Sequence, residues 1–202
     1  MTELSFLHRF EPGREAGRPP LLLLHGTGGD ESDLLPLGRE IAPGHALLSP
    51  RGKVLENGMP RFFRRLAEGV FDEADVIARA GELAGFVAQA REAYGLPAPV
   101  AVGFSNGANI AAALLLLHPE ALAGAVLLRP MAPLSAPPSP DLSGKPVLMV
   151  SGLIDPIARA ETAEPLAEQL RAVGAALRHE RIPAGHGLTA ADLRLARSAL
   201  AG

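Results

Sequence analysis

Short apolar segments bounded by glycine and proline alternate along this sequence with longer segments in which apolar residues recur at helical spacing. The inner apolar segments are almost continuously hydrophobic, as strands buried on both faces require. Strands that alternate with helices are typical of a mostly parallel sheet with crossover connections. The pattern predicts an α/β fold of about seven strands flanked by helices, the strands covering residues 4–10, 20–24, 46–49, 100–104, 125–128, 146–151 and 177–182.

Four helices are predicted from the same pattern. Helical spacing begins after Asp72, runs over residues 106–117 and 160–173, and begins again after Thr189. Asp72 and Thr189 are good N-cap residues, and Asp192 stands where it would complete a capping box. The helix over 106–117 is nearly all apolar, so it should lie buried against the sheet.

The length of 202 residues suits one domain with one sizeable core. No glycine- or proline-rich stretch is long and polar enough to separate two cores. We therefore expect a single domain over residues 1–202 without a large lid domain. The loop over residues 50–71 is the longest piece without a predicted element, and such loops in compact domains are often functional.

Charge and composition exclude several classes of protein. There are 19 Lys and Arg residues against 22 Asp and Glu, so no basic field exists to bind nucleic acid. The absence of cysteine excludes disulfides, thiolate metal sites and a cysteine nucleophile. The first residues lack the apolar segment of a secretion signal, and the apolar run 110–117 is too short to span a bilayer. We expect a cytoplasmic protein without membrane insertion.

The most informative segment is Gly103-Phe104-Ser105-Asn106-Gly107, which lies between a predicted buried strand and an apolar helix. Gly-x-Ser-x-Gly in this context is typical of a sharp turn that presents a nucleophilic serine. The two glycines let the neighbouring backbones approach closely. A serine between glycines is also common in ordinary turns, so the motif needs partners elsewhere in the chain.

A serine hydroxyl needs a base, and the base needs an orienting carboxylate. Asp155 follows the strand predicted over 146–151, and His186, between two glycines, follows the strand over 177–182. Taken alone, Asp155 could cap a turn before Pro156, and His186 could be an ordinary loop residue. Together with Ser105 they stand in the order Ser, Asp, His, each after a strand, where open α/β sheets place their sites.

A fourth element is the apolar strand that leads into His25-Gly26-Thr27-Gly28. The backbone N–H groups of Thr27 and Asn106 are candidates for an oxyanion hole, which stabilises the negative charge formed during acyl transfer. A nucleotide phosphate loop is excluded, because neither Gly-Lys-Ser/Thr nor Gly-x-Gly-x-x-Gly is present. His25 is expected to hold the turn.

With these motifs in place, the chain resembles the α/β-hydrolase superfamily over most of its length. It is most similar to the small bacterial carboxylesterase/phospholipase group that includes acyl-protein thioesterases. The resemblance implies Ser105 as nucleophile, Asp155 as orienting acid, His186 as base, and Thr27 and Asn106 as oxyanion donors.

Two features depart from the group's usual pattern. Asn106 stands where the group commonly has Gln, but only its backbone N–H is needed. Residues 49–72 replace a Trp-containing stretch of the thioesterase-like members. In this segment the chain is similar to the hydrolases linked to hydroquinone and catechol resistance, which argues against a lipid or acyl-protein substrate.

The loop over 50–71 offers Met59, Phe62, Phe63 and Phe71 as an apolar roof over the active site, with Met131 as a wall residue. These side chains could equally form a small core beneath a long loop. The same region carries four arginines, which are either solvated or bias the site toward anionic substrates: Arg51, Arg61, Arg64 and Arg65.

These observations predict a serine carboxylesterase that cleaves small carboxylic esters through an acyl-enzyme on Ser105. The alternatives are a dienelactone- or thioester-type hydrolase with the same three residues, or a ligand-binding protein that has lost catalysis. No cofactor or metal is expected, since no cluster of His and acidic residues has ligand spacing. The expected partner is a small ester substrate, and a homodimer remains open.

Overall fold

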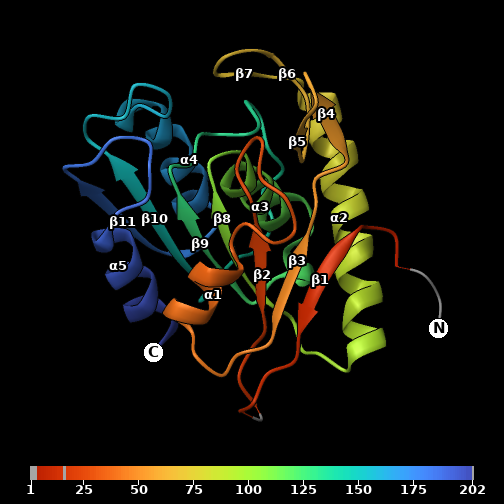
Figure 1. Ribbon diagram of the computed structural model, residues 1–202. Coiled ribbons are helices and arrows are strands. Elements are labelled where there is room, and N and C mark those ends of the chain that lie inside the picture. The colour runs from red at the N-terminus through yellow and green to blue at the C-terminus, as the bar shows by residue number, and fades with distance from the viewer. Residues whose placement is uncertain (1–3, 16, 202) are drawn as a thin grey trace.

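A computed structural model describes residues 4–15 and 17–201. Its centre is a seven-stranded sheet in the order β1-β3-β2-β8-β9-β10-β11 (Figure 1). Every pair of neighbours is parallel except β1 and β3, which are antiparallel. The strands are β1 (His8–Glu11), β2 (Leu21–Leu24), β3 (Leu47–Pro50), β8 (Val100–Phe104), β9 (Gly124–Leu128), β10 (Pro146–Gly152) and β11 (Ala176–Ile182).

All seven predicted strands are present, which confirms the predicted fold class. The largest difference is at the first strand, which begins at His8 instead of residue 4. Residues 4–7 are irregular because Phe6 turns into the core, where its ring packs 5.1 Å from that of Phe86. Elsewhere the strand ends differ from the prediction by at most one residue.

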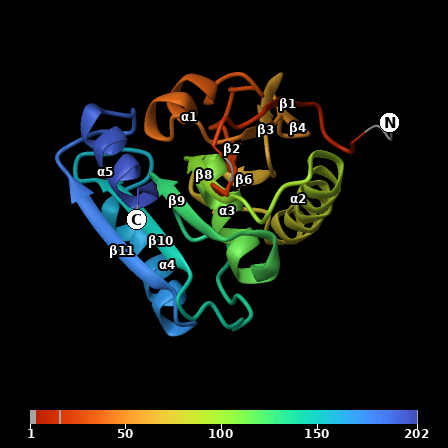
Figure 2. The same cartoon turned by 90° about the horizontal axis from the view of Figure 1, so that it is seen from below.

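In the part of the chain that the structure describes, five α-helices cover the two faces of the sheet (Figure 2). One face carries α2 (Glu73–Tyr94), α3 (Asn106–Leu117) and α4 (Ala160–Ala172), and the other carries α1 (Leu35–Ile41) and α5 (Ala190–Leu200). Every residue of α3 except the last is buried, as its apolar sequence predicts. Within the described residues, none of these helices has both the length and the apolar character that a bilayer crossing needs.

The predicted helix starts are confirmed at two caps. The Asp72 side chain accepts a hydrogen bond from the Asp75 N–H at 3.1 Å, and Thr189 and Asp192 form the capping box before α5. Helix α1 was not predicted, because it has only seven residues, includes a glycine and has no side-chain cap. That glycine, Gly38, allows close packing: a Cβ there would lie 2.9 Å from Leu23 Cδ1.

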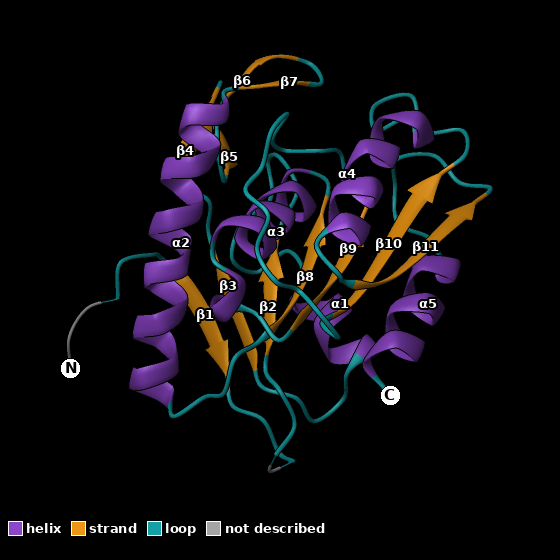
Figure 3. Ribbon diagram, turned by 180° about the vertical axis from the view of Figure 1, so that it is seen from behind, coloured by secondary structure: helices purple, strands orange, loops and turns teal. Residues whose placement is uncertain are grey.

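The segment predicted as a loop over 50–71 forms two small hairpins at the carboxyl edge of the sheet (Figure 3). The first pairs β4 (Val54–Glu56) with β5 (Met59–Arg61), and the second pairs β6 (Arg65–Ala67) with β7 (Val70–Phe71). Strands of two or three residues with mixed polarity carry no clear periodicity, so the sequence pattern could not reveal them.

Candidate active site

Ser105 lies at the turn between β8 and α3, at the carboxyl edge of the sheet. Its backbone has φ 52° and ψ −115°, which is rare for a residue other than glycine. The Ser105 N–H donates to Leu128 O at 2.9 Å, and the Asn109 N–H donates to Ser105 O at 3.0 Å. These two bonds, one from each side, hold a strained turn that carries the serine hydroxyl.

The glycines on either side of Ser105 lie where backbones nearly touch. A Cβ on Gly103 would lie 2.4 Å from Gly107 O, and a Cβ on Gly107 would lie 1.9 Å from Leu24 O. Backbone atoms cannot move aside as a flexible side chain can, so only glycine fits at both positions. The close approach also brings the turn after β2 against the start of α3.

His186 and Asp155 reach Ser105 from two other loops at the same edge of the sheet. His186 Nε2 lies 3.0 Å from Ser105 Oγ, and His186 Nδ1 lies 2.8 Å from Asp155 Oδ2. Because an ionised carboxylate can only accept, Nδ1 carries the donated proton, and Nε2 is left to accept from the serine hydroxyl. The structure thus brings the three residues predicted from the sequence into one hydrogen-bonded chain.

The carboxylate in this chain is fixed more tightly than the imidazole. The Asp155 side chain is fully buried, and its Oδ1 accepts from the N–H groups of Ile157 at 2.8 Å and Ala158 at 2.9 Å. Those bonds turn Oδ2 toward the histidine. The His186 side chain is 20% exposed and packs against the Phe104 ring, so it is the more accessible of the two.

Thr27 and Asn106, the predicted oxyanion donors, lie on the two backbone segments that Gly107 brings together. Asn106 is the first residue of α3, so its N–H has no acceptor within the helix. Thr27 lies in the turn after β2. In the described part of the chain, neither N–H forms a hydrogen bond. Each N–H thus lacks an acceptor among the described residues, as the prediction of oxyanion donors requires.

The first hairpin and its flanks, residues 52–63, are here called the strap, and they are bonded to both of these segments. The Gly28 N–H donates to Pro60 O at 2.9 Å, beside Thr27. The Phe62 N–H donates to the Asn106 side-chain oxygen at 2.7 Å. The Asn106 side chain, which the sequence suggested to be dispensable, therefore holds the strap against the start of α3.

His25 connects the strap to the glycine-rich turn. Its Nδ1 lies 2.7 Å from Gly26 O, and its Nε2 accepts from the Gly52 N–H at 3.0 Å. Accepting at Nε2 requires the neutral ring, and burial lowers the pKa of His25 below its ordinary value, with the bond to Gly26 opposing the shift. The predicted role of His25 in holding the turn is confirmed.

Arg61 is the buried charge of the strap, with 3% of its surface exposed. Its Nη1 donates to Thr27 Oγ1 at 2.9 Å and lies 3.0 Å from Glu56 Oε2, while its Nε donates to Phe63 O at 3.1 Å. Burial lowers the pKa of Arg61, and the neighbouring Glu56 carboxylate opposes that shift. This arginine therefore orders the strap and contacts the glycine-rich turn.

The other three arginines of this region also pair with carboxylates. Arg51 pairs with Glu31 and Asp30, Arg64 with Asp72 and Asp75, and Arg65 with Glu56. Of the two interpretations left open by the sequence, free cations that attract anionic substrates are thus disfavoured, because each of these arginines contacts a carboxylate of the fold.

Phe62 and Phe63 do not line a substrate pocket as predicted. They are 3% and 0% exposed and belong to the core cluster beneath the strap, so they have almost no surface to offer a ligand. The Phe63 ring packs edge-on against Phe71 at 5.2 Å between centroids. The sequence pattern could not separate a roof from a small core, and the structure places these two rings in the core.

Phe71 and Met131 do line clefts at the carboxyl edge. A cleft of about 520 Å³ runs between the second hairpin and the start of α4, and its lining residues are Glu68, Gly69, Met131, Ala132, Pro156, Ile157, Arg159 and Thr162. An adjoining cleft of about 270 Å³ includes Phe71 and shares Gly69 and Ala132 with the first. Met59 is 41% exposed and lies over Gly28.

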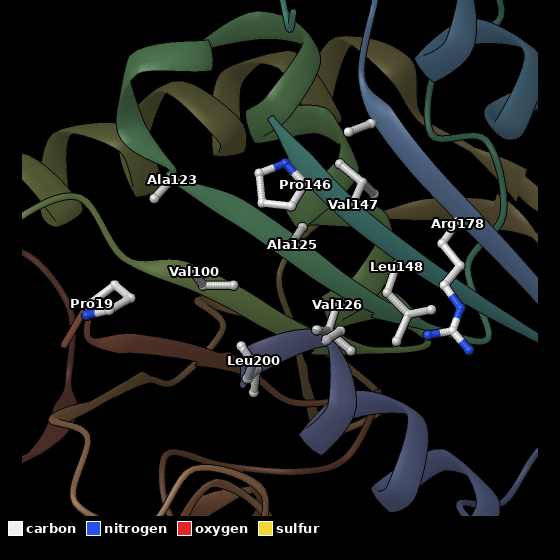
Figure 4. A pocket seen from close by; sticks show the side chains of 12 residues that line it. Pro19, Val100, Ala123, Ala125, Val126, Pro146, Val147, Leu148, Arg178 and Leu200 are labelled. Atoms are coloured by element: carbon white, nitrogen blue, oxygen red, sulfur yellow. The ribbon is translucent and has the colours of Figure 1, made fainter. Parts of the chain in front are cut away.

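A third hollow, of about 400 Å³, is lined mainly by apolar side chains (Figure 4). Its walls include Val100 and Pro146, the first residues of β8 and β10, and Leu200 at the end of α5. It is thus at the amino edge of the sheet, a strand length from the serine. Although its lining is mainly apolar, this hollow is therefore not part of the candidate active site.

The chain contains a second grouping of serine, histidine and carboxylate that the sequence did not suggest. Ser151 Oγ lies 2.9 Å from His179 Nε2, and His179 Nδ1 lies 3.8 Å from Glu164 Oε2. Ser151 is 1% exposed and lies within β10. Burial and the Arg181 charge lower the pKa of His179, which favours the neutral ring.

Sequence reasoning also missed Arg129, which follows β9 directly and is completely buried. Its guanidinium contacts the loop of His186 and the Asp192 carboxylate. Asp192 was recognised only as a helix cap. The available signal was a single charged residue directly after an apolar strand at the carboxyl edge, where functional residues of α/β sheets gather.

Comparisons with known proteins by sequence and by structure match this chain to hydrolases. Residues 64–144 match a family described as alpha/beta hydrolase fold. The chain is 49% identical over 179 residues to a Bacillus subtilis (strain 168) protein named "putative hydrolase MhqD", which covers 88% of this chain and 90% of that protein.

Two solved carboxylesterases have nearly the same structure. The Bacillus cereus carboxylesterase superposes with a TM-score of 0.95 at 45% identity, covering 98% of this chain and 94% of the other. The carboxylesterase from Mesorhizobium loti has a TM-score of 0.94 at 35% identity, covering 100% and 97%. The sequence relationship extends over nearly the whole chain and agrees with the fold, so this protein belongs to the α/β-hydrolase family, within its carboxylesterase group.

Proposed function

We propose that this protein is a serine esterase that cleaves small carboxylic esters through an acyl-enzyme on Ser105. The observation that carries the proposal is the hydrogen-bonded chain from Ser105 through His186 to Asp155, built on a strained turn at the carboxyl edge. Similarity to solved carboxylesterases supports the same reaction class.

In the first half of the reaction, Ser105 Oγ attacks the ester carbonyl carbon while His186 Nε2 takes the hydroxyl proton. The carbonyl oxygen becomes an anion and accepts hydrogen bonds from the N–H groups of Thr27 and Asn106. Asp155 keeps His186 in the required tautomer and stabilises the imidazolium. The imidazolium then protonates the departing alcohol, and the acyl group remains on Ser105.

In the second half, His186 takes a proton from water as the water oxygen attacks the acyl carbon. The bond to Ser105 Oγ breaks, and the proton returns to that oxygen. The carboxylic acid leaves, and the site is restored. No group beyond the chain and water is needed to balance these steps.

The clefts beside Asp155 support a small ester as substrate, and the larger one has polar lining residues such as Glu68 and Arg159 besides its apolar ones. The cleft of about 520 Å³ is within the range of ordinary small-molecule sites, and Met131 and Ile157 give it an apolar wall. Thioesters and lactones react by the same steps, so a panel of oxyesters, thioesters and lactones separates these alternatives.

The test is labelling with a fluorophosphonate, which reacts with activated serines, together with hydrolysis of p-nitrophenyl acetate, butyrate and octanoate. Ser105→Ala should abolish both labelling and hydrolysis, and its thermal unfolding should match the wild type. Ser151→Ala is the matched control, because it removes a second serine bonded to a histidine and should keep both signals. A folded wild type that is neither labelled nor active would instead favour a ligand-binding protein.

A further inference from the structure

Arg129 has an unusual position for a charged residue. It is 0% exposed, follows β9 directly, and has φ 57°, a left-handed conformation that non-glycine residues rarely adopt. Its backbone N–H donates to Val150 O at 2.8 Å. A buried arginine in a strained conformation is costly unless its charge and its donors are satisfied.

The five N–H groups of this guanidinium all have acceptors. Nε donates to Gly185 O at 2.8 Å, and Nη2 donates to Gly187 O at 3.2 Å. Nη1 donates to Val150 O at 3.4 Å, and the remaining two groups form a forked pair with Asp192, at 2.7 Å and 2.9 Å. The fork therefore holds the carbonyls of both residues that flank His186.

Asp192 supplies the opposite charge and is also 0% exposed. Besides the two bonds from Arg129, its Oδ2 accepts from the Thr189 N–H and from Thr189 Oγ1, each at 2.8 Å. The same carboxylate thus fixes the first turn of α5, where the loop of His186 ends. The pair connects the end of β9, the histidine loop and α5 in one buried network.

The loop is held on one side by the Ile154 N–H, which donates to Ala184 O at 3.2 Å, but the two glycines beside His186 have open space around them. A Cβ on Gly187 would meet nothing within 4 Å, and one on Gly185 would only reach Ile154 O at 4.0 Å. Glycines on both sides leave the backbone of His186 free to rotate. Bonds to the two flanking carbonyls restrict that rotation directly.

We propose that Arg129 and Asp192 are positioning residues that fix the backbone of His186 and so hold its imidazole between Ser105 and Asp155. This inference rests on the proposed function of His186 as the general base. Misplacement of a catalytic group by about 1 Å can lower the rate about 100-fold, so a clamp on both neighbours of the base has a large effect on turnover.

If Arg129 and Asp192 only stabilised the fold, replacing them would lower activity only by lowering the fraction of folded protein. A positioning role lowers the activity of the folded protein itself, so the two roles can be separated. Replacing a buried ion pair by apolar side chains of similar size is often neutral for stability, whereas removing one partner is not. The double variant Arg129→Met with Asp192→Leu therefore removes the clamp without leaving a buried charge. Because Asp192 also caps α5, we expect the variant to unfold below the wild-type temperature, while the folded protein has kcat reduced about 100-fold and KM within about threefold.

The fluorophosphonate labelling rate should fall in the same proportion, since labelling also requires an activated serine. Val87→Ala in α2 is the control for stability: it removes buried side-chain volume on the other face of the sheet and should keep kcat. Equal kcat in the double variant and the wild type would overturn the proposal. A loss of kcat no larger than the fraction of the double variant that is unfolded would also overturn it.

If the double variant does not fold, Arg129→Lys decides. An ammonium keeps the charge but has three donors instead of five and no fork, so it cannot hold both carbonyls and the carboxylate. Reduced kcat and labelling in the folded protein support positioning, and wild-type values overturn it. Ser105→Ala, measured alongside, separates the two ideas: if it stays active, the proposed function fails, whereas a wild-type-like clamp variant beside an inactive Ser105→Ala refutes only the clamp.

Discussion

Ser105 and Ser151 each lie within hydrogen-bonding distance of a histidine, at 3.0 Å and 2.9 Å, yet their surroundings differ in three respects. Ser105 lies on a strained turn, whereas Ser151 lies within a regular strand and is 1% exposed. Asp155 is 2.8 Å from its histidine, whereas Glu164 is 3.8 Å from His179.

The carboxylates also differ in what else they bind. Asp155 is buried and accepts two backbone N–H groups, which aim its free oxygen at His186. Glu164 is partly exposed and pairs with Arg171 and Arg181, which lower its pKa. A serine beside a histidine is therefore not enough: the proposed chemistry also needs an oriented acid, substrate access and nearby N–H donors.

The largest expected effect is the difference in kcat between variants of the two histidines. His186→Ala should lower kcat by about a million-fold, because no other group can take the serine proton. His179→Ala should leave kcat within about threefold of the wild type, since Ser151 has no substrate access. Both are measured with p-nitrophenyl butyrate, and comparable losses would contradict the distinction between the two groupings.

A smaller but still large effect is expected from the carboxylates. Asp155→Asn keeps the Oδ1 bonds but presents an NH₂ group to His186, which favours the wrong tautomer and should lower kcat about 10,000-fold. Glu164→Gln should keep wild-type kcat. Activity in Asp155→Asn close to that of the wild type would show that the buried acid does not orient the base.

A moderate effect is expected from the strap, which is bonded to the glycine-rich turn and to the start of α3, beside Ser105. Arg61→Met removes the bond to Thr27 Oγ1 and leaves the glycine-rich turn less fixed, so kcat should fall about tenfold, a part of the loss from deleting one oxyanion donor. Arg64→Met is the matched control, because Arg64 is 61% exposed in its side chain and pairs only with carboxylates outside this turn. Equal kcat in the two variants would argue against a role of the strap in the oxyanion hole.

The smallest effect concerns stability at acid pH. Burial lowers the pKa of His179 in the folded protein, so below pH 6.5 the unfolded chain binds a proton that the folded chain excludes. The free energy of unfolding should therefore be fully retained above that pH and should fall as the pH drops toward 5. In urea unfolding at pH 7, 6 and 5, His179→Gln should show a weaker dependence of the unfolding free energy on pH. The pKa of His25 is also lowered, so His25 accounts for part of the dependence that remains. If the unfolding free energy of His179→Gln changes with pH as steeply as that of the wild type, His179 is not a source of the pH dependence.

Features determined by local sequence could be predicted. The inner strands of the sheet are apolar runs, α3 is almost entirely apolar, and the caps at Asp72 and Thr189 are made within three residues. The turn at Ser105 was predictable because its glycines are required by contacts that any strand, turn and helix of this kind must make.

Features determined by contacts between distant residues could not be predicted. Arg129 and Asp192 are 63 positions apart, and Phe62 meets Asn106 across 44, so no spacing in the sequence relates them. The burial of Phe62 and Phe63 depends on how the strap packs, which periodicity does not describe. The second grouping at Ser151 likewise arises only when β10 and β11 are paired.

The strap and the second hairpin are attached through backbone atoms and a few polar side chains, and this has a consequence for how substrate preference can evolve. Outward side chains of the two hairpins, such as Leu55, Leu66 and Val70, are 69%, 72% and 52% exposed. Because no anchoring bond uses them, mutation can exchange them with little loss of stability. Related enzymes could thus acquire new specificities by small steps at the rim while the catalytic residues stay unchanged.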